Sequence, residues 1–299
     1  MVLGCTPTIL FGVNQDRETG SNASDVTESV LDFYRQLPFN MRESDASHAE
    51  RARKHDPLVV YPCLRGYVKR KRVLEVGCGV GWFSNGLSFH HKSDVLGIDL
   101  NPIAVEQARR TAETLRLNSR FDVANLFEFE PATRYPLAVS LGVLHHTFDC
   151  HAAIGRVCDK FVEKGGQFLL GLYHEPGRRP FLNHFSRLRE RGSSEADLRT
   201  EFRRLRGTVI DETHLESWFR DQVLHPYETQ HTYAELRPLL ESEGFEVTAT
   251  SINKFGSIRS HAEIEEEELG LASVSARALS EGRYFPGFFV ILARKVVKT

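Results

Sequence analysis

Short apolar runs alternate with longer amphipathic stretches through the middle of the chain. β-branched and apolar residues predict strands at 72–76, 95–99, 121–124, 137–141 and 167–173. Helical patterns follow at 82–89, 102–117 and 152–161. Pro102 stands at the first position of its helix, where a proline is tolerated. Strands that alternate with helices predict a parallel sheet with right-handed crossovers.

The pattern changes on both sides of this region. Residues 1–27 form a polar stretch, 30–39 predict a short helix stopped by Pro38, and 48–55 predict a charged helix. After residue 173, about seventy residues pass before the next strand candidate at 245–250. A connection of that length must carry structure of its own.

A last strand is predicted at 288–293, after an acidic run at 265–268. At ~150 residues per domain, 299 residues correspond to about two domains, or to one large α/β domain with additions. We expect the four segments to be an N-terminal arm and helical cap at 1–64, an α/β core at 65–173, a helical and aromatic lid at 174–243, and late strands at 244–299 with an acidic insertion at about 257–285.

Composition narrows the class of protein. The hydrophobic content of 41% and charged content of 26% are those of a globular chain, and the formal net charge of -2 argues against a strongly basic nucleic-acid binder. No apolar run approaches the ~20 residues that span a bilayer, and the N-terminus has no charged start typical of a signal peptide. Five cysteines without CxxC spacing fit a reducing cytoplasm.

The most informative stretch is VLEVGCGVGWF at residues 73–83. An apolar strand leads into Gly77, Gly79 and Gly81, and the loop opens onto a helix N-terminus. Glycines there allow positive φ and a close approach of a ligand to the backbone. The spacing does not match the dinucleotide fingerprint G-x-G-x-x-G, because the sixth position is Trp82. Glu75, two positions before the first glycine, suits an ammonium group, and Asp99 at the end of the next strand can accept hydrogen bonds from a ribose diol.

These motifs, together with the SLGVLHHTFD segment at 140–149, resemble those of the class I S-adenosylmethionine-dependent methyltransferases. The resemblance covers residues 72–173 and the two late strands. It implies a doubly wound, mostly parallel seven-stranded sheet of Rossmann-like methyltransferase type, with an N-terminal cap and a helical lid between strands five and six. It also implies S-adenosylmethionine as cofactor and S-adenosylhomocysteine as product.

The resemblance further assigns the cofactor-binding positions. The glycine loop lies under the methionine part of the cofactor, the acidic residue after strand two holds the ribose, and a residue after strand three contacts the adenine. The residues expected at the cofactor are Glu75, Gly77, Gly79, Gly81, Trp82, Asp99, Leu100, Asn125, Leu126 and Gly142.

Two histidines after strand four are candidates for catalysis. His145 and His146 fall where the family's segment faces the methyl group or its acceptor, and a histidine near neutrality can act as general base. The alternative is a structural histidine at a helix end, and the sequence does not choose between the two residues. His151 and Cys150 lie close by, but no neighbouring set in the sequence completes a metal site, so no metal is expected.

The methyl acceptor is expected beyond strands four and five. Tyr173 and His174 end strand five, and the fork of Arg178 and Arg179 could bind a carboxylate or phosphate. Residues 211–233 are rich in rings and polar groups, which fits a substrate lid or a homodimer interface. From this segment we add His225, Tyr227 and His231 to the acceptor site, and from the N-terminal cap we add Tyr34.

Three functions remain open. The first is methyl transfer to a small molecule, expected to be a carboxylate-bearing metabolite or amino acid with an N, O or S acceptor, methionine sulfur included. The second is methylation of RNA or protein, favoured by nine arginines among residues 178–206 and disfavoured by the lack of interleaved aromatics. The third is a cofactor-binding partner subunit without catalysis.

Overall fold

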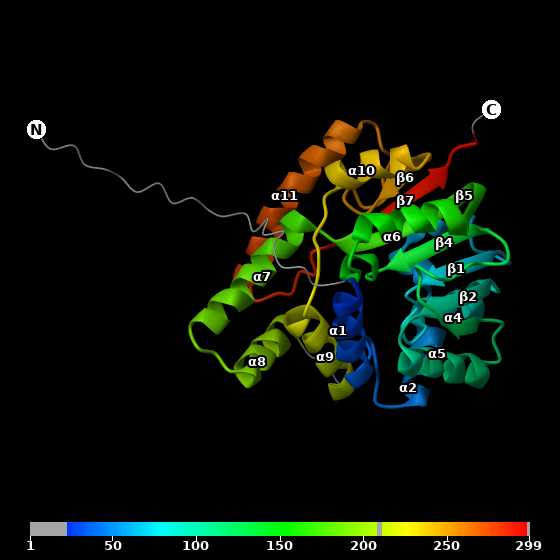
Figure 1. The fold of residues 1–299 in the computed structure, drawn as a ribbon. Helices are drawn as coiled ribbons and strands as arrows, with labels where there is room; N and C mark the ends of the chain where they lie inside the picture. Colours follow the sequence, from blue (N-terminus) through cyan, green and yellow to red (C-terminus); the bar gives the residue numbers. More distant parts are fainter. Residues whose placement is uncertain (1–22, 208–210, 298–299) are drawn as a thin grey trace, which may run out of the picture.

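The computed structural model describes residues 23–207 and 211–297 of the chain. Its centre is a seven-stranded sheet in the order β3-β2-β1-β4-β5-β7-β6 (Figure 1). Six strands are parallel to one another, and only β7 runs antiparallel to its neighbours β5 and β6. The strands are β1 Arg72–Val76, β2 Asp94–Asp99, β3 Arg120–Val123, β4 Tyr135–Leu141, β5 Val162–Tyr173, β6 Phe245–Thr250 and β7 Phe288–Lys295.

Helices cover both faces of this sheet. One face carries α6 Cys150–Arg156, the π-helical turn η3 Val157–Phe161, α10 Tyr233–Ser242 and α11 His261–Ser280. The other faces α3 Pro57–Val60, η1 Pro62–Leu64 and α4 Trp82–His91. The remaining core helices are α2 Asp45–Lys54 and α5 Pro102–Leu115. The prediction of a doubly wound Rossmann-like sheet is confirmed.

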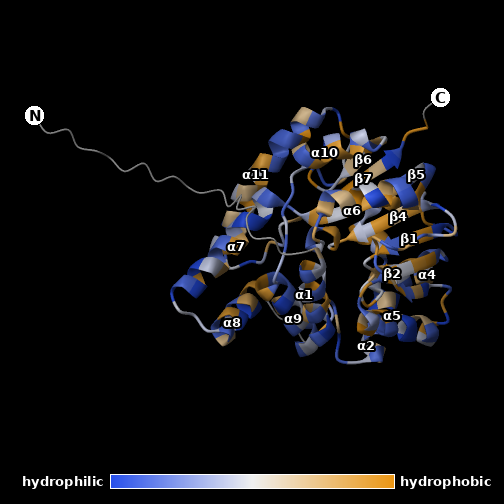
Figure 2. Cartoon of the chain, in the orientation of Figure 1, coloured by the Kyte–Doolittle hydropathy of each residue, from blue (hydrophilic) through white to orange (hydrophobic). Residues whose placement is uncertain are grey.

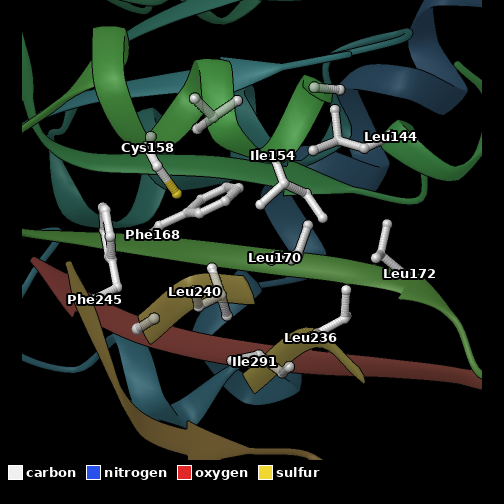
Figure 3. Packing of buried hydrophobic residues seen from close by; sticks show 14 of the residues in the cluster. Leu144, Ile154, Cys158, Phe168, Leu170, Leu172, Leu236, Leu240, Phe245 and Ile291 are labelled. Atoms are coloured by element: carbon white, nitrogen blue, oxygen red, sulfur yellow. The ribbon is translucent and has the colours of Figure 1, made fainter. Parts of the chain in front are cut away.

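The largest core cluster lies between β4, β5, β7 and the helices α6 and α10 (Figure 3). Phe168, Leu170 and Ile291 point from the sheet toward Ile154 of α6 and Leu236 of α10, and all five are buried. Burying such a side chain contributes roughly 1.5–3 kcal/mol. The carboxyl ends of β1, β2 and β4, where the candidate loops emerge, therefore rest on a rigid support.

A second, smaller core stands beside the sheet. Helices α7 Glu175–Glu190, α8 Glu195–Arg206 and α9 Glu212–Phe219 bury Phe181, Phe185, Phe202 and Phe219 against one another. They are followed by the π-helical turn η4 Arg220–Leu224. Figure 2 shows apolar stripes on these amphipathic helices among polar positions. The long connection after β5 thus carries its own structure, as expected.

The N-terminal segment differs from its prediction. Helix α1 runs from Ala23 to Gln36, so it begins within the stretch expected to be an arm and ends before Pro38. Val30, Leu31 and Tyr34 lie on the side of this helix that borders the candidate site. Residues 1–22 of the expected arm lie outside the described residues. Across the described part of the chain, no helix is both long and apolar enough to cross a membrane.

Candidate cofactor and acceptor site

A cavity opens where the carboxyl ends of β1, β2 and β4 meet. Its empty space is about 1210 Å³, part of which is open to solvent. Glycine-loop residues 75–80 line one side, and α1 with residues 38–40 lines another. The expected cofactor residues found in its lining are Glu75, Gly77, Gly79, Trp82, Asp99, Leu100, Asn125, Leu126 and Gly142.

The glycine loop is held tightly from both sides. Gly77 has φ +74°, and a β-carbon there would stand 2.3 Å from Val143 Cγ2. Gly81, which caps α4 rather than lining the cavity, has φ +76° and would place a β-carbon 2.7 Å from Ala108 Cβ. A side chain at either position would be strained and would clash. The Gly77 and Cys78 amides also donate to Ile98 O at 2.7 and 3.0 Å, which joins the loop to β2.

Asp99 ends β2 beside this loop. Its Oδ2 accepts a hydrogen bond from Gly79 N and its Oδ1 one from Asn101 N, both at 2.8 Å. Burial raises the pKa of this carboxyl, while the backbone donors counteract that effect. A carboxylate has about four acceptor positions, so acceptor capacity remains for a ligand's hydroxyl groups.

Glu75 lies deeper, under the start of α4. One of its oxygens, Oε2, accepts from Ser84 N at 3.1 Å and from the Ser84 hydroxyl. Burial raises the pKa of Glu75 to about 8. A nearby cation would favour the ionised form, so this carboxyl is suited to an ammonium group.

Asn125 follows β3, and its side chain makes hydrogen bonds within its own turn. Its Oδ1 accepts from Phe127 N at 3.0 Å, and its Nδ2 donates to Glu128 Oε1 at 3.2 Å. Both side-chain atoms thus already have local partners. Its acceptor oxygen can contact an adenine amino group only by sharing this turn.

The structure separates the two candidate histidines. His146 lines the cavity, whereas His145 does not. Nδ1 of His146 lies 2.9 Å from Tyr227 O, an acceptor, so Nδ1 carries the proton and Nε2 keeps a lone pair. That Nε2 is buried without a hydrogen-bond partner among the described residues. Burial lowers the pKa of His146, which keeps the imidazole neutral.

His145 has a different environment. It is fully buried, and its Nδ1 accepts from Tyr173 N at 3.3 Å. Burial, reinforced by His146, lowers its pKa well below the ordinary value. Its ring packs on Tyr173 with a centroid separation of 4.2 Å. These contacts give His145 a packing position behind the cavity wall.

Two lid residues, His225 and Tyr227, contact His146. The His225 ring stacks on the His146 ring with centroids 3.8 Å apart, and its Nδ1 accepts from Tyr227 N at 3.1 Å. Burial, together with His146, lowers the pKa of His225 to about 2. His225 and Tyr227 therefore support His146 and stand outside the described cavity lining.

Tyr34 joins the cap to the lid through Asp221. The hydroxyl of Tyr34 donates to Asp221 Oδ1 at 2.5 Å, and that of Tyr173 donates to Oδ2 at 2.9 Å. The backbone oxygen of Tyr34 also accepts from Asn101 Nδ2 at 2.9 Å. Tyr34 lines the cavity, but its hydroxyl already has a partner, while Tyr173 lies behind the wall.

Four other expected acceptor residues do not reach the cavity. Arg178 is fully buried and pairs with Glu228 at 2.9 Å, whereas Arg179 is exposed and pairs with Glu175. His174 caps α7 by accepting from Gly177 N at 3.1 Å, and its Nε2 lies 2.8 Å from Glu268 Oε1. His231 has partners on both nitrogens, Thr229 and Glu235. The expected arginine fork at an acceptor is thus not present: local spacing suggested it, but Arg178 meets its partners from the lid.

Sequence reasoning missed two contributions. The first is the apolar wall from α1 and the segment after it, formed by Thr27, Val30, Leu31, Pro38 and Phe39. The amphipathic pattern of residues 23–36 could have indicated it. The second is Asp221, an acidic residue in an aromatic segment whose two tyrosine partners lie far away in the sequence, so spacing gave no signal.

Comparisons with known proteins point to methyltransferases. Residues 73–166 match a methyltransferase domain family. A putative protein N5-glutamine methyltransferase of Methanocaldococcus jannaschii is 38% identical over 61 residues, which cover 20% of this chain and 31% of that protein. A ubiquinone biosynthesis O-methyltransferase of Pseudomonas putida is 30% identical over 105 residues, covering 34% and 44%. The chain thus spans less than half the length of these curated relatives.

Among solved structures, the magnesium protoporphyrin IX methyltransferase of Synechocystis PCC 6803, solved with bound S-adenosylhomocysteine, superposes with a TM-score of 0.51 at 17% identity. The match covers 91% of this chain and 99% of that one. At this identity, the likeness concerns the fold alone. Fold and glycine loop together define a Rossmann-like domain of the kind that binds S-adenosylmethionine. Residues 73–166 are thus a methyltransferase domain, and the chain has the fold and glycine loop of the class I S-adenosylmethionine-dependent methyltransferases, whose cofactor is S-adenosylmethionine.

Proposed function

We propose that this chain transfers the methyl group of S-adenosylmethionine to a protic acceptor on a small, largely apolar molecule, with His146 as general base. The observation that carries the proposal is the state of His146. It lines the cavity, its proton is fixed on Nδ1 by Tyr227 O, and its Nε2 lone pair has no protein partner among the described residues.

The cofactor would lie across the glycine loop. Asp99 would accept from the ribose hydroxyls, Glu75 would face the ammonium of the methionine part, and Leu126 and Asn125 would border the adenine. When bound, the cofactor supplies an electrophilic methyl carbon on a sulfonium. The protein then has to hold the acceptor in line with that bond, which can account for much of the acceleration.

The acceptor class follows from the remaining wall. Val30, Leu31, Phe39, Phe127 and Val143 make it apolar, and no lysine or arginine is among the described lining residues. A carboxylate there would lose its hydration without gaining a cation, which is costly. This argues for a neutral acceptor in place of the carboxylate-bearing one expected from Arg178 and Arg179.

The arginine-rich stretch at residues 178–206 gives little support for nucleic-acid binding. Arg199, Arg203 and Arg204 of the arginine-rich stretch pair with Glu216, Glu212 and Glu201 respectively. Arginines neutralised in this way contribute little to phosphate binding. A small acceptor therefore agrees better with both the cavity and the charge distribution.

The first experiment identifies the acceptor class. The full chain is incubated with methyl-labelled S-adenosylmethionine and a cell extract split into small molecules, protein and RNA. Label in an extractable, neutral small molecule supports the proposal. Label in RNA or protein contradicts it, and absence of label from a protein that still binds the cofactor favours a non-catalytic partner subunit.

The second experiment tests the base on the acceptor so identified. Since burial lowers the pKa of His146, wild-type kcat/KM should stay level near neutrality and fall only below the ordinary histidine value of 6.5. His146→Asn should lose about 10²–10⁴-fold in kcat, with partial recovery at high pH where the acceptor ionises by itself. His145→Asn is the matched variant and should keep the wild-type pH profile. A fully active His146→Asn enzyme would show that His146 is not the general base. It would favour a thioether acceptor, which loses no proton.

A further inference from the structure

Two histidines and a glutamate meet near the starts of α6 and α10, and none of them lines the cavity. His151 lies in the first turn of α6, His231 ends the segment that follows η4, and Glu235 lies in the first turn of α10. One ligand atom from each residue falls within 4.8 Å of the others. No other group of three or more such residues is found in the described ranges 23–207 and 211–297.

We propose that His151, His231 and Glu235 bind a divalent transition-metal ion of the Zn²⁺ class. Two imidazoles and a carboxylate are a ligand set that such ions accept, with the remaining positions open to water. The sequence does not predict this site, because the three residues lie on separate elements. His151 and Glu235 are 84 positions apart in the chain.

The separations suit one ion. His151 Nε2 lies 2.6 Å and His231 Nδ1 lies 3.0 Å from Glu235 Oε1. Donors at ~2.0–2.2 Å from a zinc ion stand roughly 3–3.5 Å apart. The ligand atoms of the two histidines lie within 4.8 Å of each other, so side-chain movements alone would bring all three ligands to one ion.

The hydrogen bonds around His231 leave its Nδ1 facing the carboxylate. The Thr229 hydroxyl donates to His145 O at 3.2 Å, so it must accept from His231 Nε2 at 2.9 Å. The other ring nitrogen, Nδ1, faces Glu235 Oε1 at 3.0 Å. Thr229 also fixes the ring in the orientation and tautomer of a metal ligand.

The other ligands are arranged in the same way. The second oxygen of Glu235 accepts from Thr232 N at 3.3 Å in a capping box, which leaves Oε1 for the ion. The side chains of His151 and Glu235 are 48% and 37% exposed, so an ion can enter from solvent. His231 is buried, and its backbone amide donates to Tyr173 O at 2.9 Å.

A bound ion would fasten the lid to the core. It would tie α6 to residues 229–231, and both Thr229 N and its hydroxyl already bond His145 O in the turn that carries His146. Ligand binding to the native state raises stability by mass action. We therefore expect added Zn²⁺ to raise the melting temperature and to slow amide exchange in residues 225–232.

The test uses the full chain after chelator treatment and titrates it with Zn²⁺ by calorimetry and with Co²⁺ by absorption. One ion should bind, and Co²⁺ should show the visible bands of a protein-bound ion with few ligands. His151→Ala and Glu235→Gln should each weaken binding at least about tenfold, the smallest loss usual for changes around a metal. Glutamine at position 235 keeps the capping box, so the fold is preserved.

His184 offers a matched control. Its Nε2 lies 2.8 Å from Glu201 Oε1, the same kind of pair without a third ligand. His184→Ala should bind Zn²⁺ as the wild type does. The proposal is overturned if the wild type binds no ion, or if His151→Ala and Glu235→Gln bind as tightly as His184→Ala; the cluster is then an ion pair only.

Discussion

Burial sets the ionisation of the side chains around the cavity. Glu75, with its pKa raised to about 8, is mostly protonated near neutral pH, whereas His146 is neutral because its pKa is lowered. Both groups are thus uncharged before a ligand arrives. A cationic, amino-acid-like cofactor would change this state at Glu75 first, because a positive charge stabilises the carboxylate.

This gives a prediction for cofactor binding. Near pH 7, binding of S-adenosylmethionine should release close to one proton from Glu75. The release is measured by calorimetry in buffers of different ionisation enthalpy. It should vanish well above pH 8, where the free protein has already lost that proton. The Glu75→Gln variant should bind S-adenosylmethionine more weakly and release no proton. An unchanged proton release in that variant would mean that the proton comes from another group.

At the scale of elements, sequence patterns located the core well. Residues 72–76 and 245–250 form strands with the predicted bounds, because apolar, β-branched runs bounded by loops leave little choice. Helix α5 begins at Pro102 as predicted, since Asn101 caps it and proline fits the first turn. Strand β5 begins at Val162, five residues before the prediction. Two exposed residues, Lys164 and Gly165, interrupted the apolar signal there.

The acceptor side was less predictable for a physical reason. Arg178 could be read as a clamp from its Pro-Gly context, but its guanidinium is fixed by Gln222 and Glu228, over forty residues away. Tyr34 likewise meets Asp221 across 187 positions of sequence. Such pairs depend on how the cap and lid pack, and no local pattern encodes that packing.

The contact between cap and lid yields a prediction at this scale. Tyr34→Phe removes one donor from the buried Asp221 carboxylate, and hydrogen bonds to charged groups contribute ~1.5–3 kcal/mol. Helix α1 should loosen, with faster amide exchange in residues 23–36 and a KM for the cofactor raised about tenfold or more. Tyr67→Phe changes an exposed tyrosine and is the control. Equal exchange and KM in both variants would show that Asp221 does not hold the cap.

For the whole molecule, buried histidines link stability to pH. Their pKa values in the folded state lie below the ordinary 6.5: about 4 for His48 and His214, about 2 for His225, and lowered for His145 and His146. In every case the main cause is burial. Below about pH 6.5 the unfolded chain binds protons at these sites that the folded chain does not, so the free energy of unfolding should fall as the pH drops.

The size of this effect follows from counting protons. Each such histidine contributes up to ~1.4 kcal/mol per pH unit between its two pKa values. The raised pKa values of Glu75 and Asp99 act in the opposite direction, because the folded chain holds those protons more tightly. Five histidines lower the stability at acid pH, and two carboxyls oppose them. The free energy of unfolding, measured with urea, should therefore fall clearly from pH 7 to pH 5. His48→Gln keeps an acceptor for Arg42 N and should reduce the slope by about one proton. A stability that is level or rises toward pH 5 would mean that these rings are protonated in the folded chain, and His146 would then lack the free lone pair that a general base requires.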